Sequence, residues 1–173
     1  SLDFEAAKAK LSASLKRDYS KIAREWAYQN VPRRIIAEEY ISELGKDDLL
    51  DYKMYSFHGE PKLTVVCSNR FSKIGTRMNF YDINWKPMGI HFGHYPPLPT
   101  EFPKPATYEE MKRLTAELSK DSPFLRVDFY EIKGRLFIGE LTFFPGAGFE
   151  KFRPMSKDYE LGEWLHLETV HRG

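Results

Sequence analysis

The stretch FLRVDFYEIKGRLFIGELTFFPG, residues 124–146, decides the fold that this sequence predicts. Two runs rich in β-branched and aromatic residues flank Lys133 and Gly134, a pattern typical of an antiparallel β-hairpin. Each run also carries charged residues, which a fully buried strand should lack. Because side chains alternate between the two faces of a strand, Arg126 and Asp128 share one face of the first strand.

Glu140 and Thr142 share one face of the second strand by the same alternation, and the turn decides whether it is the face of Asp128. A two-residue loop would pair Ile132 with Arg135. With that pairing, the aspartate and the glutamate would lie on opposite faces of the hairpin.

A three-residue loop over residues 132–134, with its glycine in the left-handed conformation, pairs Glu131 with Arg135 instead. Glu140 then lies across from Arg126 and diagonal to the aspartate of the first strand, within reach of a shared ligand. We favour this register because it gathers all the charge on one surface.

Two carboxylates on one rigid surface repel each other unless a positive group lies between them. Oxygen ligands beside a hydroxyl suit Mg²⁺, which takes one or two carboxylates and leaves its other positions to water and phosphate oxygens. Asp128, Glu140 and Thr142 are therefore candidate metal ligands. The alternative is a surface ion-pair cluster of Arg126 with the two carboxylates, which would contribute little to stability.

The composition excludes several classes of protein. The chain of 173 residues has 42% hydrophobic and 15% aromatic residues, as expected for one globular domain with a real core. A net charge of +1 gives no field that would attract nucleic acid or an anionic membrane. A single cysteine, Cys67, predicts a reducing, cytoplasmic location. No apolar run approaches the roughly 18 residues of a membrane span.

The periodicity predicts an α+β fold with a mainly antiparallel sheet and flanking helices. The five prolines of residues 91–105 predict a long loop without regular structure. We interpret His91 and His94, in the same stretch, as ordinary loop histidines. Helices are expected over residues 4–15 with Asp3 as N-cap, from Asp18 or Ser20 to Tyr28, over 108–118 with Thr107 as N-cap, and over 158–165; strands are expected over 34–41, 49–58, 62–68, 76–81 and 85–89.

Several phrases occur in a familiar order between about Glu25 and Leu165: VPRRIIAEEYI, DYKMYSFHG, FYDINW, LRVDFY and GELTFFPGAGF. Together they resemble the C-terminal half of the ATP-grasp fold. Within that superfamily the chain is most similar to the TupA-like branch, which is linked to teichuronopeptide and bacterial surface-polysaccharide synthesis.

The resemblance implies a nucleotide site. Glu43 or Asp51 would bind the ribose hydroxyls, with Asp51 preferred because it begins the following strand, and Lys53 could contact phosphate as a compact point charge. The residues that would read the adenine edge, through backbone groups at the hinge between lobes, are Glu38, Glu39, Tyr40 and Ile41.

The resemblance also implies catalytic roles. Asp128 and Glu140 match the two acidic metal ligands of the family, and Arg126 matches the arginine that stabilises the transferred phosphoryl group. Thr142 stands where most relatives have asparagine, so its contact to Mg²⁺ would be weaker or water-mediated. The implied chemistry is carboxylate activation: ATP phosphorylates a small-molecule carboxylate, and an amine displaces phosphate from the acyl-phosphate.

One part of the family pattern is not found. ATP-grasp enzymes carry a lysine-bearing strand and a glycine-rich loop before the hinge, and nothing before Arg33 resembles them. We therefore expect a single C-terminal lobe over residues 1–173, with residues 1–32 as a helical lead-in and 33–173 as the nucleotide- and metal-binding lobe. The sequence start also looks like the interior of a longer chain. This chain alone should bind ATP weakly and turn over poorly, and the face left by an absent lobe could drive self-association.

Three classes of function stay open at this point. The first is an ATP-dependent carboxylate–amine ligase. The second is a metal-dependent phosphohydrolase or nucleotidyl-transfer domain that uses the same carboxylates. The third is a non-catalytic nucleotide-binding module of ATP-grasp ancestry.

Overall fold

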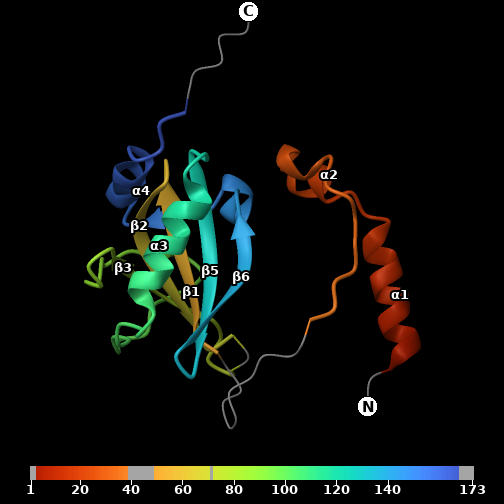
Figure 1. Cartoon of the computed structure of the whole chain (residues 1–173), viewed down its shortest axis with the longest axis horizontal. Helices are drawn as coiled ribbons and strands as arrows, with labels where there is room; N and C mark the ends of the chain where they lie inside the picture. Colours follow the sequence, from red (N-terminus) through yellow and green to blue (C-terminus); the bar gives the residue numbers. More distant parts are fainter. Residues whose placement is uncertain (1–2, 39–48, 71, 168–173) are drawn as a thin grey trace, which may run out of the picture. The chain divides into compact units, whose positions relative to one another are not determined.

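The protein is described by a computed structural model that covers residues 3–38, 49–70 and 72–167. These residues fall into two compact units (Figure 1). The N-terminal unit comprises residues 1–41 with Gly146–Gly148, and the sheet unit comprises residues 42–145 and 149–173. Each unit is described here by itself.

The N-terminal unit begins with α1, Phe4–Leu15, as the sequence predicts. Asp3 caps this helix, because its Oδ1 accepts a 2.9 Å hydrogen bond from the backbone N–H of Ala6. The second predicted helix is shorter than expected and broken. It consists of α2, Tyr19–Ala23, and a 3₁₀ turn η1, Trp26–Tyr28, because the residue after α2 takes a left-handed conformation.

The strand predicted over residues 34–41 is wrong for residues 34–38, which form no strand. Ile35 and Ile36 are 50% and 77% exposed, and no described segment pairs with their backbone. A strand needs a partner for its backbone groups, so an apolar run alone does not define one. Residues 39–41 lie outside the described part of the chain.

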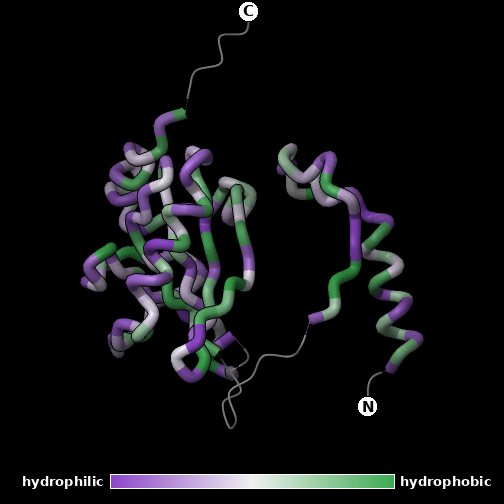
Figure 2. Tube along the Cα trace, viewed as in Figure 1, coloured by the Kyte–Doolittle hydropathy of each residue, from purple (hydrophilic) through white to green (hydrophobic). Residues whose placement is uncertain are grey.

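A five-stranded antiparallel sheet forms the centre of the sheet unit, in the order β3-β2-β1-β5-β6. The predicted α+β fold with a mainly antiparallel sheet is confirmed. Figure 2 shows apolar and polar segments interleaved along these strands, as alternation between two faces requires. The strands are β1 Asp51–Phe57, β2 Glu60–Ser68, β3 Arg77–Asp82, β5 Phe124–Ile132 and β6 Arg135–Thr142.

Helix α3, Tyr108–Ser119, covers one face of the sheet (Figure 1). It was predicted over residues 108–118. Its Met111 packs into a fully buried cluster with Met54, Val127 and Phe129 of the strands below. Burial of such side chains supplies most of the stability of a sheet–helix layer.

Both ends of α3 are attached to the sheet. At the start, Thr107 occupies the predicted N-cap position, but its side chain makes no capping hydrogen bond. Its backbone N–H and its hydroxyl donate instead to Glu131 Oε2, at 2.8 and 2.6 Å. At the other end, the hydroxyls of Ser56 and Ser119 lie 2.7 Å apart. The turn between β1 and β2 also lies close, because a Cβ on Gly59 would be 3.1 Å from the Cα of the residue after α3.

The opposite face of the sheet has two halves. Over the apolar half, around Leu63 and Phe80, pack the short strands β4, His91–Phe92, and β7, Phe152–Arg153, and the closing helix α4, Met155–Gly162. This helix lies three residues earlier than predicted. Over the other half lie the charged side chains described below. A turn η2, Pro145–Gly148, follows β6.

The irregular region between β3 and α3 differs from the prediction in two places. Residues 85–89 form no strand, and Pro87 makes only a single bridge to Tyr81. The proline-rich stretch that follows does contain regular structure, since the two-residue strand β4 pairs with β7. Short pairings of this kind leave no periodic signal in the sequence.

Candidate functional site

The charged half of the sheet is built on the β5–β6 hairpin, whose turn differs from the prediction. Ile132 pairs with Arg135, so the loop has two residues and the expected three-residue loop is wrong. Lys133 and Gly134 both have positive φ angles, 51° and 74°, as a type I′ turn requires. A lysine seldom takes this conformation, so the sequence did not indicate it.

A β-bulge further along the hairpin restores the shared face. Phe129 pairs with Ile138 but Asp128 pairs with Glu140, so β6 carries one extra residue, Gly139, at this step. Glu140 therefore lies directly across from Asp128, and not across from Arg126 as predicted. The predicted result, both carboxylates on one face, is present in the structure by a different route.

Both oxygens of Asp128 are held by cations. The Arg126 guanidinium donates from Nε to Oδ1 at 2.7 Å and from Nη2 to Oδ2 at 2.8 Å, in a two-point contact. Lys53, which pairs with Asp128 across β1 and β5, donates from Nζ to Oδ2 at 2.5 Å. The carboxylate is 2% exposed, so these contacts replace most of its hydration.

Glu140 extends the cluster toward solvent. Its side chain is 59% exposed, and its Oε2 lies 3.4 Å from Nη2 of Arg126. Its other oxygen accepts a 2.8 Å hydrogen bond from the hydroxyl of Thr142. One guanidinium thus bridges the two carboxylates, and a hydroxyl lies beside the more accessible of them.

Asp51 forms the inner end of the cluster. Its Oδ2 lies 2.7 Å from Lys53 Nζ and 3.4 Å from Nη1 of Arg70, in the loop after β2. Its Oδ1 is buried without a hydrogen-bond partner. A buried carboxylate oxygen without a partner is costly, so this atom is a candidate contact for a ligand.

The electrostatics favour charged cations in this cluster. Burial alone would lower the pKa of Lys53, but the carboxylates of Asp51 and Asp128 outweigh it and raise that pKa above its usual value. The pKa of Arg126 is likewise raised, since hydrogen bonds to Asp128 outweigh its burial. Burial raises the pKa of Asp51, with the ammonium beside it acting in the opposite direction.

A sequence model of the TupA-like ATP-grasp family matches residues 1–166 of the 173. The chain belongs to the TupA-like ATP-grasp family. The family resemblance predicted from the sequence is confirmed. No curated protein and no solved structure matches the chain. Membership indicates an enzyme of the ATP-grasp ligase type, and this superfamily generally uses ATP and Mg²⁺.

The donor set of this TupA-like protein fits Mg²⁺. Asp128 and Glu140 face each other on one side of the sheet with the Thr142 hydroxyl beside them, and Mg²⁺ in nucleotide sites needs only one or two carboxylates. Within residues 3–38, 49–70 and 72–167, no group of three or more His, Cys, Asp or Glu side chains is arranged to hold a metal ion. The fit is thus to a metal that shares its remaining positions with water and phosphate.

The cluster is not the surface ion-pair network that the sequence left as an alternative. Asp51 and Asp128 are buried, and Lys53 and Arg126 are each only 12% exposed. Buried charges are expensive to desolvate and seldom increase stability over apolar side chains of similar volume. Their presence under a partly open face therefore favours a functional site.

Most of the predicted adenine-binding hinge lies outside the described part of the chain. Glu39, Tyr40, Ile41 and the alternative ribose residue Glu43 lie outside the described residues. Glu38 is described and exposed, but it belongs to the N-terminal unit. Of the predicted nucleotide residues that the structure describes, Asp51 and Lys53 lie in the cluster.

The loop histidines form no site in the described part of the chain. His94 Nε2 lies 3.6 Å from Glu150 Oε1, and the His91 strand pairs with β7. The interpretation of both residues as ordinary loop histidines stays a prediction.

Sequence reasoning missed three residues of the cluster. Arg70 contacts Asp51, and it also hydrogen-bonds to Tyr130 of β5. Gly139 provides the bulge. The alternation along β5 places Tyr130 on the face of Asp128, so this residue could have been found from the sequence. Arg70 lies in an irregular loop and Gly139 inside a strand, and neither pattern indicates which residue it contacts.

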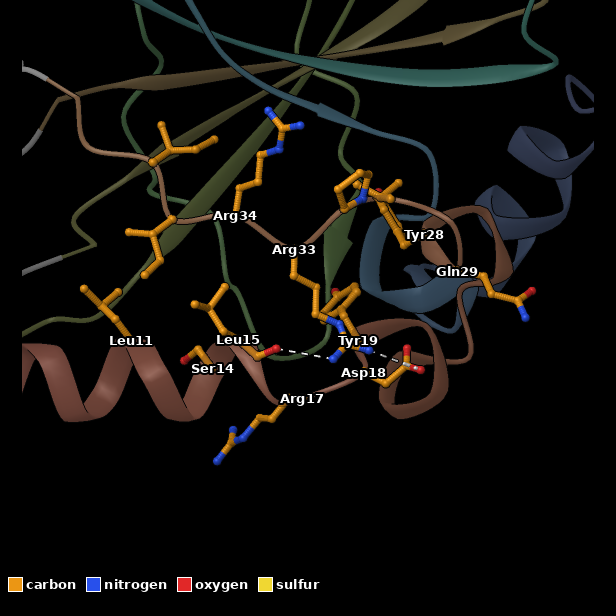
Figure 3. Close-up of a pocket in the computed structure, with 14 residues that line it drawn as sticks. Leu11, Ser14, Leu15, Arg17, Asp18, Tyr19, Tyr28, Gln29, Arg33 and Arg34 are labelled. Carbon is orange, nitrogen blue, oxygen red and sulfur yellow. Dashed lines mark hydrogen bonds and ion pairs between the residues drawn. The ribbon is translucent and has the colours of Figure 1, made fainter.

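The N-terminal unit contains a separate cavity of about 390 Å³ (Figure 3). Arg33 crosses it, with its guanidinium 3.3 Å from the carbonyl oxygen of Leu15 and 3.5 Å from Asp18. Arg17 and Arg34 also line the cavity, and Figure 3 shows them pointing in different directions. The arginines do not converge on one point, so these three side chains do not form a common anion site.

Among the described residues, no helix is both long enough and apolar enough to cross a bilayer.

Proposed function

We propose that this protein is an ATP- and Mg²⁺-dependent carboxylate–amine ligase that acts through an acyl-phosphate. The observation that carries the proposal is the pairing of Asp128 directly across from Glu140, with Arg126 and Lys53 in contact with the aspartate. Family membership supports the ligase class. The cluster combines metal-holding carboxylates and fixed cations, the parts that phosphoryl transfer needs from a protein.

Asp128 and Glu140 would hold Mg²⁺, with Thr142 adding a hydroxyl directly or through water. The metal, when bound, neutralises charge on the phosphate oxygens. Thr142 donates to Glu140 and so fixes the orientation of that carboxylate before any ligand arrives.

Arg126 and Lys53 would stabilise the phosphoryl group in transfer. Both side chains are held by Asp128, and their raised pKa values keep them cationic at neutral pH. A guanidinium fixed by two hydrogen bonds loses little further entropy on binding phosphate. These two residues thus supply preorganised positive charge where negative charge develops.

The reaction balances as two displacements. A carboxylate oxygen of the substrate attacks the γ-phosphorus of ATP, and the bond to the bridging oxygen breaks to release ADP. The amine nitrogen then attacks the acyl carbon, phosphate leaves, and the nitrogen loses a proton. The substrates would be small-molecule carboxylates and amines, in bacterial surface-polysaccharide or teichuronopeptide synthesis.

The nucleotide would be read at Glu38, Glu39, Tyr40 and Ile41 through backbone groups. Asp51 remains the proposed residue for the ribose hydroxyls. Its Oδ1 has no hydrogen-bond partner and could accept one from a hydroxyl. Its Oδ2 meanwhile orients Lys53.

The decisive experiment measures ADP release with a panel of carboxylic acids and amines. Asp128→Asn should abolish acid-dependent ADP release, because it removes a metal ligand and the anchor of both cations. Asp121→Asn, at an exposed position outside the cluster, should match the unchanged protein. Phosphate release that needs neither acid nor amine would instead support the phosphohydrolase.

A second candidate is a non-catalytic nucleotide-binding module. The observation that favours it is the full engagement of both Asp128 oxygens by Arg126 and Lys53, which a metal would have to displace. Calorimetry with ATP separates the two candidates. Nucleotide binding without ADP release, across the whole panel, would support the module and contradict the ligase.

A further inference from the structure

The position of Glu140 depends on a single residue of β6. Below the bulge, Ile132 pairs with Arg135 and Phe129 with Ile138; continuing that register would pair Glu140 with Val127, on the α3 face. The bulge at Gly139 moves Glu140 to the face of the cations. Whatever maintains the bulge therefore decides whether the two carboxylates meet.

Gly139 is in close contact with an aromatic ring from the neighbouring strand. A Cβ at this position would lie 2.6 Å from Cε2 and 3.2 Å from Cδ2 of Tyr130. Real Cβ atoms do not approach carbon so closely, so the Tyr130 ring occupies the space that a side chain would need. The glycine is required here for the close approach of the ring.

Tyr130 extends this contact to the inner end of the cluster. It hydrogen-bonds to Arg70, and Arg70 lies 3.4 Å from Asp51 Oδ2, the oxygen that also contacts Lys53. A continuous set of contacts thus runs from the bulge in β6 to the lysine in β1. Asp51 is the one carboxylate in this set, which does not include Asp128 or Glu140.

We propose that Gly139 is a positioning residue for the site: because the Tyr130 ring occupies the space that a side chain would need, only glycine fits at the bulge that places Glu140 opposite Asp128. This inference rests on the proposed function for its catalytic meaning, but its structural content can be tested without any turnover. Gly139 does not touch substrate and acts through the register of β6.

The first test measures the register by NMR in Gly139→Ala. Cross-strand nuclear Overhauser contacts between residues 128 and 140 should be lost, because the new methyl group displaces the ring and the bulge. Gly162→Ala is the matched control, since a Cβ there meets nothing within 4 Å, and it should keep the contacts. Retention of the 128–140 contacts in Gly139→Ala overturns the proposal.

The second test is a rescue, which also covers the case in which Gly139→Ala does not fold. Tyr130→Ala removes the obstructing ring, so the double variant Tyr130→Ala/Gly139→Ala should fold and recover the 128–140 contacts. Tyr130→Phe keeps the ring and should keep the register. A double variant as damaged as Gly139→Ala would show that the ring is not the cause, and the proposal would fail.

The third measurement uses Mn²⁺ with a non-hydrolysable ATP analogue, followed by electron paramagnetic resonance. Gly139→Ala should weaken Mn²⁺ binding by about tenfold or more, a typical effect of misplacing a residue that orients a metal ligand. Gly162→Ala, where the new Cβ meets nothing within 4 Å, should stay within about twofold. If the unchanged protein binds no Mn²⁺, the proposed function fails, whereas the register data still decide the role of Gly139.

Discussion

Under α3, the sheet presents Met54, Val127 and Phe129, all fully buried and in contact with apolar neighbours. On the other face of the same strands, Asp51 and Asp128 are buried almost as deeply. Adjacent residues of one strand, such as Val127 and Asp128, thus enter environments of opposite chemistry. One face derives stability from burial, and the other spends some of it on desolvating charge, as functional sites commonly do.

The largest effect should come from the apolar face. Phe129→Ala removes a fully buried ring and leaves a cavity, which should lower the free energy of unfolding by about 4 kcal/mol. Urea denaturation followed by circular dichroism measures it. Phe149→Ala, at an exposed position, should cost less than about 0.5 kcal/mol. Equal losses in the two variants would contradict the assignment of this face as the core.

The next largest effect should come from the charged face. Lys53→Met keeps the length of the side chain but leaves Asp51 and Asp128 as two buried carboxylates without their shared cation. We expect a loss of about 3 kcal/mol at pH 7 in the same urea assay. Lys62→Met, which removes an exposed pair with Glu60, should cost less than about 1 kcal/mol. A Lys53→Met variant as stable as the unchanged protein would contradict the view that the two buried carboxylates depend on this cation.

A smaller effect is expected where the apolar face contains a polar pair. Ser56→Ala removes one partner of the buried Ser56–Ser119 contact, but Ser119 still donates to the carbonyl oxygen of Thr115 at 2.6 Å. The loss should therefore be about 1 kcal/mol. Exposed Ser72→Ala serves as the control, and a loss above about 3 kcal/mol would show that the pair matters more than its geometry implies.

The smallest effect concerns the stability of the protein at alkaline pH. The side chain of Tyr108 is buried, and this burial raises the pKa of its hydroxyl. Since the folded protein keeps this proton longer than the unfolded chain, the contribution is complete below about pH 10 and is lost as pH rises further. Between pH 9 and 10.5, the free energy of unfolding of Tyr108→Phe should therefore fall less than that of the unchanged protein. Tyr159→Phe, at an exposed position, should follow the unchanged protein in the same pH series of thermal unfolding.

The sequence predicted those parts of the fold that depend on local periodicity. The apolar spacing and the capping aspartate located α1 to the residue, and the alternation along β5 and β6 placed the right charges on shared faces. The strand predicted over residues 34–41 is wrong in its described part. A strand forms only where a second segment pairs with it, and the apolar run shows nothing about that second segment.

The site was predictable in its residue types but not in its geometry. Two local errors compensated: the turn is one residue shorter than expected, and the bulge at Gly139 restores the face. The sequence indicated neither the two-residue turn nor the bulge. A lysine rarely has a positive φ angle, and a glycine in a strand can mark a bulge, a bend or a close contact. Arg70 was missed because its partner Asp51 lies 19 residues earlier, at the start of β1, with two strands and a turn between them.

The attachment of α3 at both ends has a mechanical consequence. Glu131 holds the helix at one end of the sheet, and Ser56 with the Gly59 turn holds it at the other. Attachment at both ends opposes sliding or tilting of α3 when a ligand binds on the reverse side of the strands. We therefore expect ligand entry to be accommodated by rotation of exposed side chains such as Glu140 and by movement of the neighbouring loops, with little change in the spacing of β1 and β5.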